Sequence, residues 1–251
     1  MGLSAGSAAG VLAVPVLPAL LAGTAVMAAV QGLWEVVGGP LRMAAAMSAL
    51  AFLLAGVNLA AGTRWWEYAG GFAAGALWQG VVIATTARAS GPSLKACLRG
   101  LRARWRDAAP YAGTLAVTGV LGVATAWVLP VSHAVWLATS ALRVAKPNTA
   151  TRRGRAWARV VGTIGGGLLA ALLLTPPLTL TERAVVIALT VCAMQLAGAA
   201  HYGWWTLCLT VVALSFSMEH GTNDWRLAGI RMSLTVAGAA LAVTVTSVAD
   251  R

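Results

Sequence analysis

The chain has 251 residues, of which 59% are hydrophobic and only 10% are charged, yet its net charge is +11. Its pI is near 11.2 and its mean hydropathy is +0.79. A composition this apolar argues against a nucleic-acid-binding domain, which such a basic pI would otherwise suggest, and is typical of an integral membrane protein.

The sequence lacks the usual signatures of ATPases and enzymes. No GxxxxGK[ST] phosphate loop occurs, and Lys95 and Lys146 are the only lysines, so this chain cannot energise transport with ATP. No GxSxG motif, paired-carboxylate motif or CxxC pair is present, and the histidines lack metal-ligand spacing. We therefore expect no enzyme activity, no cofactor and no metal site.

Nine apolar runs predict an all-α, polytopic transmembrane helix bundle of about nine spans, three plus six. A spanning helix needs about 20 mainly apolar residues. In chain order the runs cover 8–30, 41–61, 68–87, 110–129, 132–147, 160–176, 184–200, 204–219 and 228–248. The run 132–147 would make only about 24 Å of helix, so we expect it to be shielded by protein, surrounded by thinned bilayer or broken.

The first run is interpreted as a retained span, because the first 34 residues carry no charge and a signal peptide would begin with a basic region. Pro15 and Pro18 are expected to kink this span or to delay its start. We predict three parts of the chain. They are an N-terminal three-helix transmembrane segment at 1–88, a basic cytoplasmic linker at 89–109 and a six-helix transmembrane domain at 110–251.

Two basic blocks, residues 88–106 and 143–159, hold 12 of the 18 Lys/Arg, and only Asp107 offsets them. Cytoplasmic loops retain cations, so we predict that both blocks lie inside, which places the N-terminus outside and the C-terminus in the cytoplasm. The blocks could also contact the headgroups of anionic membrane lipids. Arg231, at the outer start of the last run, is expected to snorkel or to pair with Asp224.

Small residues one helical turn apart predict close helix contacts. Gly71 and Gly75 form one such pair, and Gly162 and Gly166 form another; we favour packing over a substrate role for both. Most of the tryptophans near predicted helix ends, Trp205 among them, are explained by interfacial anchoring.

Arg155 and Arg159 share a helix face at i, i+4. Two interpretations remain open for them: structural anchoring on lipid phosphates, or a cytoplasmic vestibule that recruits organic anions. In the second, Arg143 adds a cation and Trp136 an aromatic wall. Gln79 and Gln195 lie inside predicted spans, where amides either tie helices together or bind substrate.

The second half of the chain resembles the fusaric acid resistance (FUSC-like) family of bacterial integral membrane transporters, which includes aromatic acid exporters. The resemblance is carried by HAVWLATSALRVAKPNT at 133–149 and RRGRAWARVVGTIGG at 152–166, with an echo in RMSLTVAGAALA at 231–242. It implies that the six-helix domain at 110–251 is FUSC-like. It also implies secondary transport across the bacterial cytoplasmic membrane, with efflux of small organic anions, aromatic anions among the candidates.

The sequence also departs from the family pattern. The linker has only about 20 residues where family members commonly have a sizeable cytoplasmic domain. The opening three helices of the family's first half have no counterpart in this sequence, and Arg143 replaces a Gln. No Asp or Glu lies near an expected bilayer midplane, although proton antiport usually needs one. The alternative is therefore a non-transporting scaffold or subunit, a truncated family member that needs a partner. We expect a homo-oligomer or a partner subunit in either case.

Overall fold

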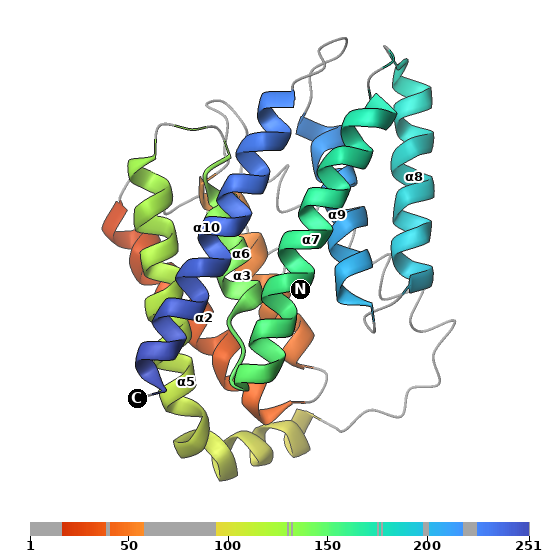
Figure 1. Ribbon diagram of the computed structural model, residues 1–251. Coiled ribbons are helices and arrows are strands. Elements are labelled where there is room, and N and C mark those ends of the chain that lie inside the picture. The colour runs from red at the N-terminus through yellow and green to blue at the C-terminus, as the bar shows by residue number, and fades with distance from the viewer. Residues whose placement is uncertain are drawn as a thin grey trace. The chain divides into compact units, whose positions relative to one another are not determined.

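The computed structural model describes residues 17–38, 41–57, 94–129, 131, 133–174, 176, 178–197, 201–217 and 225–250. These residues form eight α-helices (Figure 1). In chain order they are α2 (Leu17–Val37), α3 (Leu41–Val57), α5 (Leu94–Val128), α6 (Val135–Val144), α7 (Thr149–Leu174), α8 (Leu180–Ala197), α9 (Tyr202–Ser217) and α10 (Trp225–Ala249). The chain forms two compact units, residues 1–142 with 245–251, and residues 143–244.

Four of the helices are long and apolar enough to cross a membrane: Leu17–Val37, Leu98–Val128, Thr149–Leu174 and Trp225–Ala249. The helices α3, α8 and α9 have 17, 18 and 16 residues. Large apolar side chains point outward, with Leu172 70% and Leu196 89% exposed. A lipid environment accommodates such a surface. An all-α membrane protein is thereby confirmed, whereas the number of nine spans stays a prediction.

The first unit is built around α2, which packs against both α3 and α5. A glycine allows the close approach of α2 and α5, because a Cβ on Gly32 would lie 2.7 Å from the Cα of Ala112. Helix α2 begins at Leu17 with Pro18 in its first turn, where a missing N–H costs nothing. It ends in a C-cap at Gly38, whose φ is +80° and whose N–H donates to the Trp34 carbonyl at 2.9 Å.

Helix α6 is shorter than the predicted run 132–147. Its 10 residues make about 15 Å of helix, which is half of a hydrocarbon core. Residues 135–142 are all buried. Within the first unit, Gly122 of α5 allows α6 to approach, since a Cβ there would lie 2.9 Å from the Cα of Ala138. Of the three expectations for this segment, the structure favours shielding by protein.

Helix α5 has 35 residues and begins well before the predicted run 110–129, so most of the basic linker is helical. Hydropathy reports burial in lipid rather than helicity, and the Leu, Ala, Lys and Arg of this segment are good helix formers. The helix contains Pro110, which cannot donate to Arg106 and favours a kink. In Figure 1 the yellow first part of α5 runs crosswise to the green part that follows. Helix α7 likewise begins at Thr149, before the predicted run 160–176, because its first residues are too charged to register as apolar but are still helical.

In the second unit, α9 packs against both α7 and α8. Helix α8 begins with a capping box. The Thr179 backbone N–H and hydroxyl each donate to Glu182 Oε2 at 2.8 Å, and the Glu182 N–H donates to Thr179 Oγ1 at 3.3 Å. Arg183, 9% exposed, donates to the Ser215 carbonyl at 3.4 Å and so links α8 to α9.

Candidate functional site

A side-chain cap sets the start of α7, the helix that carries most of the second basic block. Asn148 Oδ1 accepts a hydrogen bond from the Thr151 N–H at 3.1 Å. Arg152, only 2% exposed, donates from Nη2 to Thr149 Oγ1 at 3.0 Å. Pro147 disfavours continuation of the preceding helix. The sequence Lys-Pro-Asn-Thr therefore ends one helix and begins the next, and this fixes where the following arginines project.

Two arginines, Arg155 of α7 and Arg143 at the end of α6, meet the aromatic start of α9. The guanidinium carbon of Arg155 lies 4.6 Å from the centre of the Tyr202 ring, inside cation–π range. Tyr202 stacks on Trp205, with ring centroids 6.3 Å apart and planes inclined by 13°. The guanidinium carbon of Arg143 lies 6.0 Å from the centre of Trp205. We call these four residues the arginine–aromatic cluster.

A second pair of cations is buried deeper in the same unit. Arg159 of α7, one turn beyond Arg155, and Arg231 of α10 are each 5% exposed. The two guanidiniums are close enough to repel each other. Two like charges in a low-dielectric environment raise the local positive potential, which favours an anionic ligand.

The glycines of α7 make this arrangement possible. A Cβ on Gly162 would overlap the Gly203 carbonyl oxygen, and a Cβ on Gly166 would overlap the Leu207 carbonyl oxygen. Both glycines are buried against α9. Small residues on one face of α7 thus hold α9 close at successive turns, which brings Tyr202 within reach of Arg155.

Among the described residues of the second unit, Glu182 is the one acid, and it is engaged with Thr179 at the start of α8. Hydrogen bonds from the Thr179 backbone N–H, then from its hydroxyl, hold the pKa of Glu182 below its ordinary value.

The other residues that the sequence singled out lie elsewhere. Trp136 is buried in the first unit and stacks on His133 at 4.8 Å, so its role as an aromatic wall stays a prediction. Gln195 is exposed on α8. Gly71, Gly75 and Gln79 lie outside the described residues.

Sequence reasoning missed three members of this region: Tyr202, Trp205 and Arg231. The sequence predicts that Trp205 is an interfacial anchor and that Arg231 lies at the outer start of the last span, whereas Arg231 is buried on the second turn of α10. One feature of the sequence does indicate that Tyr202 and Trp205 lie together. Tyr202 and Trp205 are three residues apart and flank Gly203, so they share a helix face next to a close contact.

An all-α bundle with four candidate spans and an outward-facing apolar surface defines a multi-pass membrane protein. The family described as "Fusaric acid resistance protein-like" matches residues 120–245, just over half of the chain. The chain belongs to this family, which confirms the resemblance seen in residues 133–166. Comparisons with curated proteins and with solved structures each gave no match.

Proposed function

We propose that this protein is a secondary transporter that exports small organic anions, aromatic carboxylates among them, across the bacterial cytoplasmic membrane. The observation that carries the proposal is the arginine–aromatic cluster, in which Arg143 and Arg155 lie against the stacked rings of Trp205 and Tyr202. A guanidinium binds a carboxylate through two parallel hydrogen bonds, and neighbouring rings stack on an aromatic substrate.

The proposed substrate path continues from the cluster toward Arg159. An anion that reaches Arg155 meets Arg159 one turn further along α7, with Arg231 beside it. Arg155 is half-buried and Arg159 is buried. In the proposed path, the anion therefore passes from the surface into the unit by moving from Arg155 to Arg159. With no phosphate loop in the chain, we propose that a gradient or a partner protein supplies the energy.

The proposed topology has nine spans, with the C-terminus in the cytoplasm and both basic blocks inside. Eight of the spans correspond to α2, α3, α5, α6, α7, α8, α9 and α10, and the ninth to the run 68–87, outside the described residues. Helix α6 is the short member and crosses only with protein around it. A homo-oligomer, formed through the first three spans, or a partner subunit completes the bundle, in contact with membrane lipids but not with nucleic acid.

Accumulation of labelled benzoate in cells that express the chain tests this proposal. Wild-type protein is compared with Arg143→Ala and Arg155→Ala at matched membrane levels. Arg153→Ala is the matched control, because Arg153 is an exposed cation of the same helix. We expect the wild type and the control to lower accumulation and the two cluster variants not to do so.

Two results would contradict the proposal. Equal accumulation in cells with and without the chain, across a panel of organic anions, favours the non-transporting subunit. Export that all three variants retain removes the cluster from the substrate path.

A further inference from the structure

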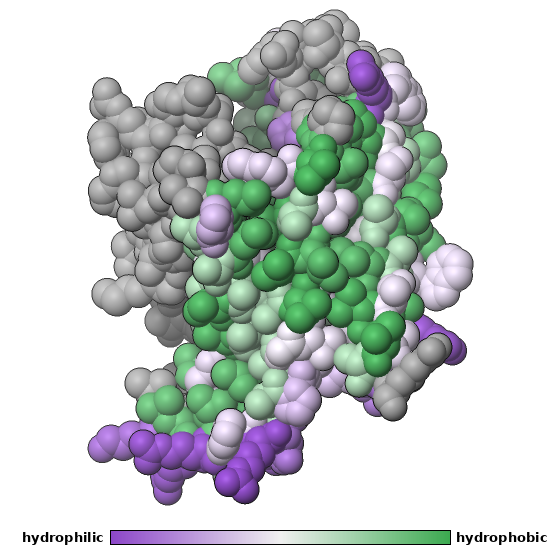
Figure 2. All heavy atoms as spheres, turned by 90° about the vertical axis from the view of Figure 1, so that its left-hand side faces the viewer, coloured by the Kyte–Doolittle hydropathy of each residue, from purple (hydrophilic) through white to green (hydrophobic). Residues whose placement is uncertain are grey.

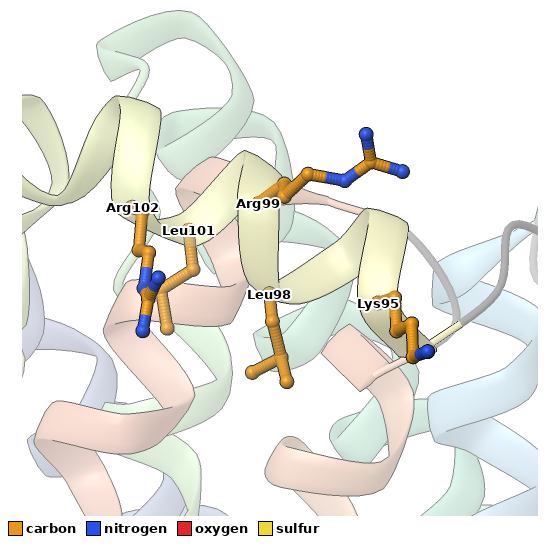
Figure 3. A pocket seen from close by; sticks show the side chains of 5 residues that line it. All are labelled: Lys95, Leu98, Arg99, Leu101 and Arg102. Carbon is orange, nitrogen blue, oxygen red and sulfur yellow. The ribbon is translucent and has the colours of Figure 1, made fainter.

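A separate cationic pocket lies in the first unit, on the crosswise first part of α5. A cavity of about 500 Å³ is lined by three cations and two leucines: Lys95, Leu98, Arg99, Leu101 and Arg102. In Figure 3 the side chains of Leu98, Leu101 and Arg102 extend from the same side of the helix, whereas Arg99 extends from the opposite side. Positively charged and apolar side chains therefore line the same pocket.

The residues that line the pocket belong to two adjacent stripes, one of cations and one of apolar side chains, that run along this part of α5. Lys95, Arg99, Arg102 and Arg106 follow each other at four, three and four residues, so their backbone positions form one row along the helix, from which the Arg99 side chain turns away. Leu98, Leu101 and Trp105 recur at three and four residues and form the neighbouring apolar face. The cations are exposed, and so are Leu98 at 46% and Trp105 at 53%. A charged stripe beside an apolar stripe is typical of a helix that lies in a membrane interface.

Contacts within the first unit hold this part of α5 against the end of a candidate span. A Cβ on Gly100 would lie 3.7 Å from Cγ1 of Val37, the last residue of α2. On the same helix, the guanidinium carbon of Arg106 lies 5.9 Å from the centre of the Trp105 ring. Figure 2 shows hydrophilic side chains gathered at the lower edge, where Figure 1 places the yellow part of α5, with hydrophobic side chains above them.

We propose that this pocket binds one anionic phospholipid, with the phosphodiester on Lys95 and Arg102 and the start of an acyl chain along Leu98 and Leu101. Charge complementarity selects an anion, and the leucines select one that carries hydrocarbon. A free phosphate would use the cations but would gain nothing from the leucines. The site is independent of the proposed transport path, because the described residues that line it all belong to the first unit.

Native mass spectrometry of the full chain in neutral detergent tests the site. Phosphatidylglycerol is titrated against wild type, Arg102→Gln and the double variant Lys95→Gln with Arg102→Gln. The charge-matched control combines Arg104→Gln, on the same helix but not lining the pocket, with Arg153→Gln in the other basic block. We expect about fivefold weaker binding for Arg102→Gln and about thirtyfold for the double variant, with the control near wild type.

Two further arms separate the sources of the phosphate. Leu98→Asn keeps every cation, so it should weaken phosphatidylglycerol binding but not the binding of glycerol phosphate. Phosphatidylcholine, which has no net charge, should not compete. Equal losses for the control and the pocket variants would overturn the site, and equal binding of glycerol phosphate and phosphatidylglycerol would overturn the lipid assignment. Unchanged midpoints of thermal unfolding show that these exposed substitutions leave the fold intact.

Discussion

The guanidinium of Arg155 sits over the Tyr202 ring, 4.6 Å from its centre. This contact joins the basic start of α7 to the first turn of α9. Arg155 thus combines two features that the sequence presents separately: a cation of the block that favours a cytoplasmic position, and a partner for an aromatic residue 47 positions later. The proposed function assigns to this one side chain both a topological role and the recognition of an anion.

The Tyr202 ring and its hydroxyl have opposite effects on stability. The hydroxyl is buried without a hydrogen-bond partner among the described residues, which costs free energy. Tyr202→Phe keeps the ring beneath Arg155 and should raise the free energy of unfolding by about 1 kcal/mol. Tyr202→Leu loses the cation–π contact and the stacking on Trp205, and should lower it by about 1–2 kcal/mol. Thermal unfolding in detergent would measure both; a Phe variant less stable than the Leu variant would contradict this account.

The contact of α7 with α9 should be intolerant of a single added methyl group. In Gly166→Ala the Cβ would overlap the Leu207 carbonyl oxygen, which belongs to a helix backbone and cannot move aside alone. We expect a loss of about 1–3 kcal/mol. Gly154→Ala is the matched control, since nothing lies within 4 Å of a Cβ at that position of the same helix. The control should gain up to about 1 kcal/mol, because Ala is the better helix former. Similar thermal unfolding midpoints for both variants would argue against the close packing.

Local patterns made part of this architecture predictable. The glycines at 162 and 166 indicate a close contact through their spacing, and Thr179 with Glu182 has the S/T-x-x-E pattern of a helix start. Helix ends were less predictable, because the hydropathy of residues 94–109 and 149–159 reports their charge and not their helicity. An apolar run shows which part of a helix can enter lipid, whereas α5 and α7 extend beyond that part.

The start of α8 offers a test by titration. The hydrogen bonds from Thr179 favour the ionised carboxylate of Glu182 and lower its pKa. The resulting stabilisation is present above the ordinary pKa of a glutamate, about 4.3, and is lost as the pH falls through the lower folded value. Thr179→Val removes the hydroxyl but keeps the backbone N–H, so we expect the pKa of Glu182 to rise only part of the way to the ordinary value. Carbon NMR of labelled glutamates, assigned with Glu182→Gln, measures this; an unchanged pKa would contradict a role for the hydroxyl.

Residues distant in sequence account for what could not be predicted. Arg159 and Arg231 become neighbours only in the folded second unit, where Met232 of α10 lies against Gly167 of α7, and no periodicity relates positions 72 residues apart. The same holds for Arg143 and Trp205. Each of these side chains has an ordinary explanation when it is considered alone, as a snorkelling cation or an interfacial anchor. Their shared position in the fold suggests a site.

Ligand-dependent stability can test that site without any transport assay. A ligand that binds only the folded protein adds about 2.7 kcal/mol at a hundred times its dissociation constant, so benzoate at saturating concentration should raise the midpoint of thermal unfolding. The rise should disappear in Arg155→Gln and Arg159→Gln, because each removes a cation from the proposed path. It should persist in Arg153→Gln, an exposed cation two residues from Arg155. Cyclohexane carboxylate separates charge from aromaticity, since it keeps the carboxylate but cannot stack on Tyr202, and its smaller shift would assign the difference to the rings. A rise of equal size in all the variants would mean that benzoate stabilises the protein elsewhere.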